Sequence, residues 1–281
     1  MSGKEFIRRF AHHRMALISL IILVVELLIV GLGPIVMDLD PTSIDSSAFS
    51  AAPSEEHLLG TDGSGRDIFS RLIYGGRMSL LVGVGATLVS VLVGLPLGLL
   101  AGFYRGRWEA VIMRASDIFQ SFPTIVLTLV LVAVFGSSVP LLIAIIGVLH
   151  WPAVGKLIYG NALSVRSKEY VEAERTIGAS DLKLLFCTVL PNCIAPLWVS
   201  LAFRISSSML TESSLSFLGA GIRPPMASWG NIIQEASSLA VLTTRWWIWI
   251  PAGLCLMVTV VCLNFVGEGV RDALDPKMKR V

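Results

Sequence analysis

The chain has 281 residues, of which 54% are hydrophobic and only 15% are charged, and its formal net charge is +2. A soluble domain usually carries about 25% charged residues, so this composition excludes an ordinary soluble protein. Together with the spacing of its apolar runs, it predicts an all-α integral membrane protein. The four cysteines lie in or beside apolar runs without a CxxC pair, and we expect buried thiols rather than metal ligands.

Six apolar runs are candidates for transmembrane helices, because a helix needs about 20 apolar residues to cross the hydrocarbon core. The first run has a basic flank, as a signal peptide would, but it is too long and no A-x-A site closes it. We therefore expect it to be retained as a membrane anchor. The runs cover residues 15–36, 78–103, 119–135, 140–154, 191–218 and 246–266.

The distribution of basic residues predicts the orientation of these spans. Most of the 22 lysines and arginines fall before the first run, between the second and third, between the fourth and fifth, and after the sixth. Cytoplasmic loops carry the excess of Lys and Arg, so six spans place both termini in the cytoplasm. Residues 1–77 then hold the N-terminal tail, the first transmembrane helix and an external loop. Residues 78–268 form a core of five transmembrane helices with a cytoplasmic loop, 155–190, and residues 269–281 form a cytoplasmic C-terminal tail.

Two glycine patterns have structural interpretations. The segment Gly60–Asp67 reads GTDGSGRD, which is close to the phosphate-binding loop G-x-x-x-x-G-K-[ST], but an aspartate replaces the hydroxyl residue and the loop lies outside. We interpret it as a turn-rich loop that docks on its own helices or on a partner. In the second run, Gly94, Gly98 and Gly102 line one helix face, and this spacing favours close helix packing in lipid.

The fifth run is the most polar. Arg204, Ser208 and Glu212 recur at every fourth position and share one helix face, with Thr211 beside them. Charges at membrane depth usually face a cavity or a partner, so these four residues are candidates for lining a translocation path. The alternatives are an internal Arg204–Glu212 pair that fixes packing, or a position of Glu212 near the outer surface. Glu26 in the first run suits either a packing contact or a transport role.

The long cytoplasmic loop contains a charged segment with helix-capping signals. Ser167 is the expected N-cap of a short helix over residues 168–177, and Gly178 is the expected residue that ends it. Ser180 or Asp181 is expected to cap a second helix that continues into the fifth span. A capped, charged helix between two spans does not face lipid, so we expect it to present a surface to something in the cytoplasm.

This segment reads Glu172-Ala173-Glu174, then Gly178 after three residues, then Thr188-Val189-Leu190-Pro191 after nine more. The pattern resembles the signature of ABC importer permeases, E-A-A, three residues, G, nine residues, I-x-L-P. The resemblance implies a coupling helix that sits in a groove of a cytoplasmic ATPase. Glu174 and Thr188 depart from the signature, and Glu174 would add a charge at the docking surface. The residues thereby assigned to ATPase coupling are Glu169, Tyr170, Val171, Glu172, Ala173, Glu174, Gly178, Ala179, Leu190 and Pro191.

Further segments narrow the resemblance to one branch of the family. They are, in chain order, HLLGTD at 57–62, GRD at 65–67, SRLI at 70–73, EYV at 169–171, LSFLG at 215–219, SWG at 228–230 and RDALDP at 271–276. These segments resemble those of dipeptide/oligopeptide ABC importer permeases. The likeness is strongest to the second permease subunit of that branch, which has a short N-terminal region.

The resemblance implies a type I ABC importer permease architecture in the bacterial plasma (inner) membrane. Its implied partners are a homologous second permease subunit, two ATPase subunits, an extracytoplasmic substrate-binding protein and membrane lipid, but no nucleic acid. The chain would supply half of the translocation path as a non-catalytic subunit. It would bind no cofactor or metal, because ATP and Mg belong to the ATPases. Di- or oligopeptides are the expected solutes, and nickel or metallophore complexes, glutathione and sugar-like solutes are variants.

Two other classes of function are less compatible with the residues. In an ion-coupled secondary transporter, Glu26, Arg204 and Glu212 would relay protons or ions. Such folds often contain internal repeats and paired broken helices, and the sequence shows neither. An intramembrane enzyme would need a nucleophile with its base, or metal ligands, inside the spans. The sequence offers no such set, so we expect no catalytic site.

Overall fold

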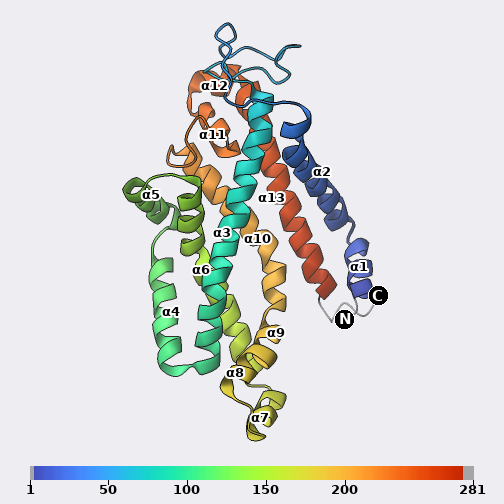
Figure 1. Ribbon diagram of the computed structural model, residues 1–281, viewed down its shortest axis with the longest axis vertical. Coiled ribbons are helices and arrows are strands. Elements are labelled where there is room, and N and C mark those ends of the chain that lie inside the picture. Colours follow the sequence, from blue (N-terminus) through green and yellow to red (C-terminus); the bar gives the residue numbers. More distant parts are fainter. Residues whose placement is uncertain (1–2, 275–281) are drawn as a thin grey trace.

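The computed structural model describes residues 3–274 and confirms the all-helical prediction for them. The only β pairing in that range is two isolated bridges, Ile44 with Arg66 and Thr61 with Asp67. The long helices run along the length of the molecule (Figure 1). The loop 37–67 lies at one end, and the short helix α7 (Glu169–Thr176) lies at the other.

Four helices are each long and apolar enough to cross a membrane. Two bent helix pairs bring the number to six if each pair counts as one span. Many outward side chains of the first long helix are apolar and exposed, as lipid contact requires; Leu27, for example, is 54% exposed. The four long helices are α2 (Arg14–Val36), α3 (Ile68–Tyr104), α6 (Val139–Arg166) and α13 (Trp246–Leu274).

The first bent pair differs from the expected third span. Helices α4 (Gly106–Ser121) and α5 (Thr124–Phe135) meet at 87°, so the break falls inside the expected run 119–135. Phe122 has an extended backbone there, because the ring of Pro123 disfavours helical conformation at the preceding residue. The expected start was also wrong, since α4 carries charged side chains that a search for apolar runs rejects.

The second bent pair leads into the fifth span, with a bend of 54°. The expected continuous helix 191–218 is therefore wrong at its start. Pro196 lies in the first turn after the bend, where the missing N–H removes no helical hydrogen bond. The elements are α8 (Asp181–Lys183), the π-helical turn η1 (Leu184–Val189), α9 (Leu190–Cys193) and α10 (Ala195–Phe217).

Helices α3 and α6 approach closely along the three glycines of α3. A Cβ atom on Gly94 would lie 2.6 Å from the Cβ of Val154, and one on Gly102 would lie 2.6 Å from the Cβ of Ala162. At Gly98 a Cβ would overlap a backbone carbonyl of α6. Any larger residue at these positions would push the two backbones apart, so the glycines set the spacing of this helix pair.

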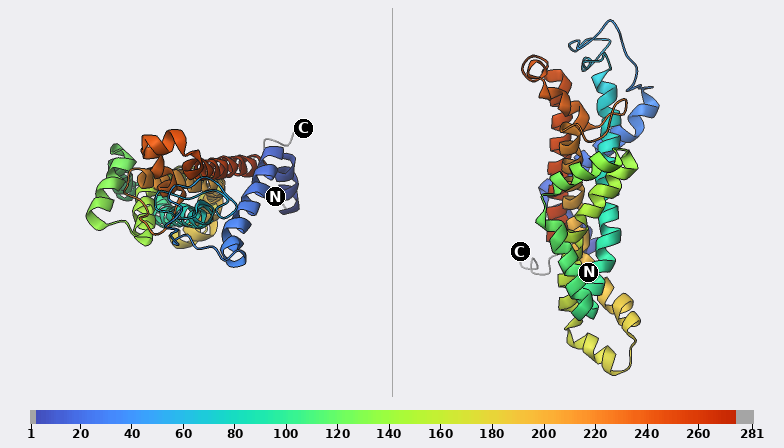
Figure 2. Two further views of the ribbon diagram at one scale, coloured as in Figure 1. Left: turned by 90° about the horizontal axis from the view of Figure 1, so that it is seen from above. Right: turned by 90° about the vertical axis from the view of Figure 1, so that its left-hand side faces the viewer.

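The N-terminal helices lie along α13. The Thr259 hydroxyl of α13 donates a hydrogen bond to the Glu26 carboxylate of α2, so Glu26 makes an interhelical packing contact. A Cβ on Gly269 would come within 3.0 Å of the Phe10 ring of α1 (Gly3–His12). Seen from above, α1 and α2 form one edge of the bundle, and α4 and α5 form the opposite edge (Figure 2).

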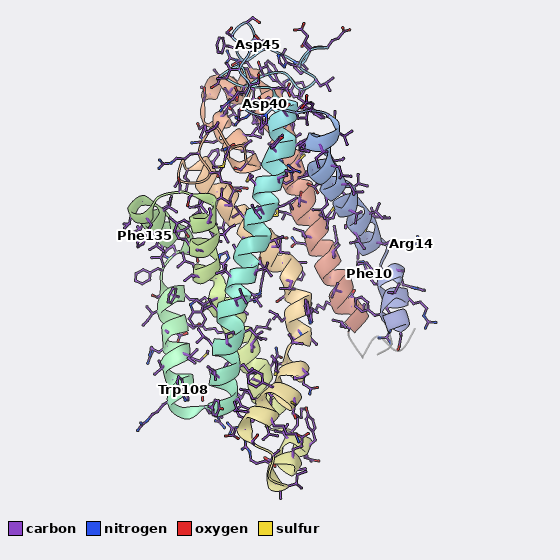
Figure 3. All side chains as sticks on the ribbon, viewed as in Figure 1. Phe10, Arg14, Asp40, Asp45, Trp108 and Phe135 are labelled. Carbon is purple, nitrogen blue, oxygen red and sulfur yellow. The ribbon has the colours of Figure 1, made fainter. Side chains whose placement is uncertain are left out.

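The segment between α10 and α13 covers the end of the bundle that also carries the loop 37–67. Asp40 and Asp45 lie in that loop, and Trp108 of α4 lies toward the other end (Figure 3). Short helices bring polar groups of this segment against α3 and α10. They are α11 (Trp229–Gln234), the 3-10 turn η2 (Glu235–Ser237) and α12 (Leu239–Thr244).

Candidate functional site

Helix α7 projects beyond the ends of the long helices (Figure 1). Its N-cap is Lys168, which has an extended backbone and makes no side-chain capping bond. The expected N-cap, Ser167, is wrong, because its hydroxyl donates instead to the Ser164 carbonyl at 3.0 Å. Ser167 therefore belongs to the end of α6, where such local back-bonding satisfies a terminal carbonyl.

Gly178 ends α7 as expected, because its φ of +88° lies in the left-handed region that favours glycine. The Ala179 amide donates to the Glu174 carbonyl at 3.0 Å and closes the turn. The Ser180 hydroxyl accepts a hydrogen bond from the Lys183 amide at 3.4 Å and caps α8. The turn between α7 and α8 is thus held by its own backbone and cap.

One side of α7 is fixed to the bundle and the other faces outward. Val171 is 1% exposed and belongs to a hydrophobic cluster with Leu184 and Val189. Ile177, at the end of the helix, is 84% exposed. Of the residues assigned to coupling, Glu169, Tyr170, Glu172, Ala173, Gly178 and Pro191 are exposed, whereas Val171, Glu174, Ala179 and Leu190 are buried or half-buried.

The two departures from the signature contact each other. The Thr188 hydroxyl donates to a carboxylate oxygen of Glu174 at 2.7 Å. Thr188 is buried and Glu174 is half-buried. The expectation that Glu174 adds a charge at the docking surface therefore needs correction, because this carboxylate is turned toward η1.

A cavity of about 280 Å³ lies between α3, α6 and α10. Its one charged side chain is Arg204, whose guanidinium donates to the Ser200 hydroxyl at 3.2 Å and to the Ala153 carbonyl at 3.0 Å. The other polar residues of the lining are Ser90, His150, Ser200 and Ser207.

The remaining path candidates, which are also on α10, do not line this cavity. Ser208 is buried, with its hydroxyl 3.3 Å from Nδ1 of His150. Half-buried Thr211 donates to the Ser207 carbonyl at 2.8 Å. Glu212 is fully buried, and its carboxylate accepts hydrogen bonds from several serine hydroxyls. The donors are Ser216 at 2.7 Å, Ser79 at 3.3 Å and Ser213 at 3.4 Å.

Arg204 and Glu212 are thus engaged with different partners. Within residues 3–274 no ion pair joins them, and the alternative of an internal Arg204–Glu212 pair is wrong for this structure. Glu212 instead helps to hold α11, because Ser79 also accepts the Trp229 amide at 3.2 Å. The shared helix face predicted for the two charges does not bring both of them into the cavity.

The sequence analysis missed Ser200 of α10 and two cavity residues on other helices, Ser90 in α3 and His150 in α6. A single polar residue in an apolar run more often satisfies a core contact, and only tertiary packing places these two opposite Arg204. The sequence signal that could have identified them is that each lies about as far along its span as Arg204 does along its own. Among the described residues, His, Cys, Asp and Glu form no group of three that could hold a metal ion.

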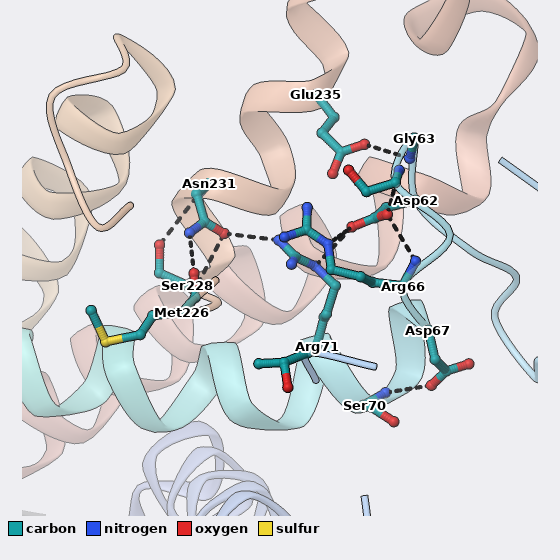
Figure 4. A network of polar contacts seen from close by, with 12 residues as sticks. Asp62, Gly63, Arg66, Asp67, Ser70, Arg71, Met226, Ser228, Asn231 and Glu235 are labelled. Atoms are coloured by element: carbon teal, nitrogen blue, oxygen red, sulfur yellow. Dashed lines mark hydrogen bonds and ion pairs between the residues drawn. The ribbon is translucent and has the colours of Figure 1, made fainter. Parts of the chain in front are cut away.

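The loop 37–67 docks on its own helices, one of the two interpretations expected for its GTDGSGRD segment. Asp62 is fully buried and forms ion pairs with Arg66 at 2.7 Å and Arg71 at 3.3 Å (Figure 4). Arg71 reaches Asn231 of α11 at 3.5 Å. The Gly63 amide donates to Glu235 at 3.3 Å. The GTDGSGRD segment is therefore a structural anchor.

His57 strengthens the same loop through two carboxylates. Its Nδ1 lies 3.1 Å from Asp67, and its Nε2 lies 3.5 Å from Asp45. Burial lowers the pKa of His57, but the hydrogen bonds and charges of Asp67 and Asp45 outweigh it and raise the pKa above its ordinary value. The stabilisation from protonated His57 is therefore fully present below the ordinary histidine pKa and is lost as the pH rises through the higher folded-state value.

The fold has a counterpart among solved structures. It is similar to a chain solved in inward-facing conformations of the MetNI methionine ABC transporter, with a TM-score of 0.60 at 17% identity. The likeness covers 73% of this chain and 97% of that chain. Residues 94–280 match the family model described as the binding-protein-dependent transport system inner membrane component, and residues 3–53 match that of the N-terminal TM domain of oligopeptide transport permease C. The chain belongs to the binding-protein-dependent transport system inner membrane component family, whose members are permease subunits of ABC transporters.

Relatives from three bacteria align with nearly the whole chain. A Brucella suis protein with the provisional name of peptide permease is 39% identical, over 96% of this chain and 89% of its own. The glutathione transport system permease protein of Pectobacterium atrosepticum is 37% identical, over 98% of this chain and 91% of its own length. The di/tripeptide transport system permease protein of Pseudomonas aeruginosa is also 37% identical, over 98% and 92%.

Proposed function

We propose that this chain is a membrane-spanning subunit of an ATP-driven importer, in which it forms half of the translocation path for di- or oligopeptides. The observation that carries the proposal is the position of α7. It projects from the bundle, it is ended by its own capped turn, and it exposes the signature residues Glu172, Ala173 and Gly178. A projecting helix of this kind suits a groove in a cytoplasmic ATPase.

The packing of α7 gives this proposal a mechanism. Val171 ties α7 to Leu184 and Val189, and the same hydrophobic cluster includes Leu99 of α3 and Val154 of α6. Movement of α7 with an ATPase would therefore be transmitted to helices that line the cavity. ATP-driven closure of two ATPases would draw the coupling helices together and turn the cavity outward, and hydrolysis would reset it.

The proposal includes a topology and a set of partners. In the proposed topology each bent pair counts as one of six spans, and both termini lie in the cytoplasm of a bacterial inner membrane. The two bent pairs and the excess of Lys and Arg on that side support it. The partners are a homologous second permease, two ATPase subunits and an extracytoplasmic binding protein. This chain would bind neither ATP nor Mg and would carry no catalytic residue.

Peptides are the proposed solutes because two relatives are named for peptide or di/tripeptide transport. Glutathione is the second candidate, because a relative of similar identity is named for glutathione transport. Glutathione is itself a small peptide with free carboxylates, so both candidates share the chemistry of the solute.

The test is a pull-down of the tagged chain in mild detergent with its neighbouring subunits, followed by mass spectrometry and an ATPase assay. We expect a second permease and two ATPase subunits, and ATP hydrolysis that is lost in Glu172→Arg. The matched control is Glu55→Arg, the same change at an exposed residue of the outer loop. Recovery of this chain alone under every mild condition would contradict the proposal and favour an ion-coupled secondary transporter.

A further inference from the structure

The cavity between α3, α6 and α10 contains a cation without a counter-charge. Arg204 has five N–H donors, and it donates hydrogen bonds to Ser200 and Ala153. No Asp or Glu lines the cavity, and within residues 3–274 Arg204 takes part in no ion pair. Glu212, two turns along the same helix, is buried among serine hydroxyls. The guanidinium therefore keeps donors directed at the cavity.

A charge at membrane depth is costly, and such residues usually face a partner or mark a solute pathway. Arginine is well suited to a carboxylate, because its planar fork can donate two parallel hydrogen bonds. The hydroxyls of Ser90 and Ser207 and the imidazole of His150 line the same cavity and can add neutral hydrogen bonds. This lining thus favours a small anion and repels an ammonium group.

We propose that this cavity is a transient binding site for a carboxylate, and that the carboxylate is the C-terminus of a peptide in transit. This inference rests on the proposed function. The volume of about 280 Å³ is at the lower limit of ordinary ligand pockets, so it suits a small group such as a chain terminus and does not hold a long peptide. A chain terminus is common to peptides of any sequence, and the positive charge of Arg204 excludes the amino terminus.

The test uses the complete transporter in proteoliposomes with its binding protein. ATP-dependent uptake of trialanine and of trialanine amide is compared at saturating binding protein, after the affinity of the binding protein for each peptide has been measured separately. We expect Arg204→Gln to reduce trialanine uptake about tenfold, since a hydrogen-bonded charge pair is lost, while uptake of the amide changes less than twofold. Arg204→Lys should retain part of the uptake, because it keeps the charge but loses the fork.

The matched control is Arg223→Gln, the same change at an exposed residue of the outer segment, which should leave both uptakes unchanged. Equal losses for the two peptides in Arg204→Gln, or no loss, would overturn the inference. If uptake of Ala-Glu-Ala amide depended on Arg204 as strongly as that of trialanine, the site would also bind side-chain carboxylates. The assignment of the ligand as the C-terminal carboxylate would then be wrong. Absence of ATP-dependent uptake of any peptide by the unaltered complex would instead reject the proposed function.

A second measurement does not depend on delivery by the binding protein. Ser207 is exposed and lines the cavity, so Ser207→Cys can be labelled with a small neutral maleimide. The background is Cys187→Ser, because Cys187 is exposed and not buried as the sequence analysis expected. We expect trialanine to slow the labelling and trialanine amide to leave its rate unchanged, with the difference abolished by Arg204→Gln. Equal protection by both peptides, or no protection at saturating trialanine, would overturn the inference.

Discussion

Arg77 compensates for a proline in the neighbouring helix. Pro34 lies inside α2 and has no N–H, so the Val30 carbonyl one turn earlier loses its helical donor. The Arg77 guanidinium of α3 donates to Val30 at 2.9 Å and to Gly31 at 2.7 Å. In a lipid environment a carbonyl without a partner is costly, so this single side chain allows the proline to remain in a spanning helix.

We therefore expect Arg77→Ala to destabilise the attachment of α2 by about 1 to 3 kcal/mol, the usual cost of an unpaired buried polar group. In a Pro34→Ala background the helix regains its own N–H donor, and the same arginine substitution should have a much smaller effect. The measurement is the thermal aggregation midpoint of the purified chain for the four members of this cycle. Additive effects would show that Arg77 and Pro34 are independent.

Only part of the candidate site could be predicted from the sequence of single residues. The polar pattern of one helix was enough to select Arg204. It could not separate Arg204 from Glu212, because helical spacing specifies a face but not how far a neighbouring helix covers it. Glu212 is buried by serines of α3 and of its own helix, and His150 reaches the cavity from a different span. Those contacts depend on tertiary packing.

The segment of α7 and η1 contains a compensating pair. The signature places small or apolar residues where this chain has Glu174 and Thr188, and the structure joins the two by a hydrogen bond of 2.7 Å. Each polar group satisfies the other at the base of α7. This chain therefore has a hydrogen-bonded polar pair at the two positions where the signature has an apolar pair.

Restoring the signature one residue at a time should weaken this region more than restoring it completely. We expect Glu174→Ala and Thr188→Ile each to lower the stability of the complex and its ATP-driven uptake. The double variant should recover most of the loss, with a coupling of about 1 kcal/mol between the sites. Thermal aggregation midpoints and uptake of the four variants would measure it. A double variant as impaired as the sum of the singles would contradict the pairing.

The apolar runs identified most of the long helices but not their ends. The expected second span, 78–103, lies within α3, which begins at Ile68 because Asp67 caps it by accepting the Ser70 amide at 2.8 Å. Arg71 lies in that first part, and hydropathy cannot foresee that Asp62 neutralises it. The bend at Pro123 had a visible signal, but the choice between a break and a kink depends on what the flanking helices pack against.

At the scale of the whole molecule, the two ends differ in kind. One end carries the loop 37–67, fixed by ion pairs, and the other carries α7 and the turn between α3 and α4. The N-terminal helix α1 packs beside the last turns of α13. The first described helix and the C-terminal end of the last one therefore lie at the same end of the bundle. This arrangement agrees with an even number of spans.

The proposed orientation can be tested with two cysteines at opposite ends. In a Cys187→Ser background, we expect a membrane-impermeant maleimide to label Ser46→Cys in the outer loop of intact spheroplasts. Arg107→Cys, in the first turn of α4, should be labelled only after permeabilisation. Both positions are exposed, so each serves as the accessibility control for the other. Labelling of Arg107→Cys in intact cells would show that the topology is inverted.

The anchor around Asp62 has a mechanical consequence. It joins the loop 37–67 to α3 through Arg71 and to α11 through Asn231. A force on this loop therefore acts directly on the first turns of α3. Further along α3, its three glycines pack closely against α6, and α6 is followed directly by α7. The α3–α6 pair thus connects the two ends of the molecule by close packing, and we expect a force applied to the loop 37–67 to be transmitted to α7.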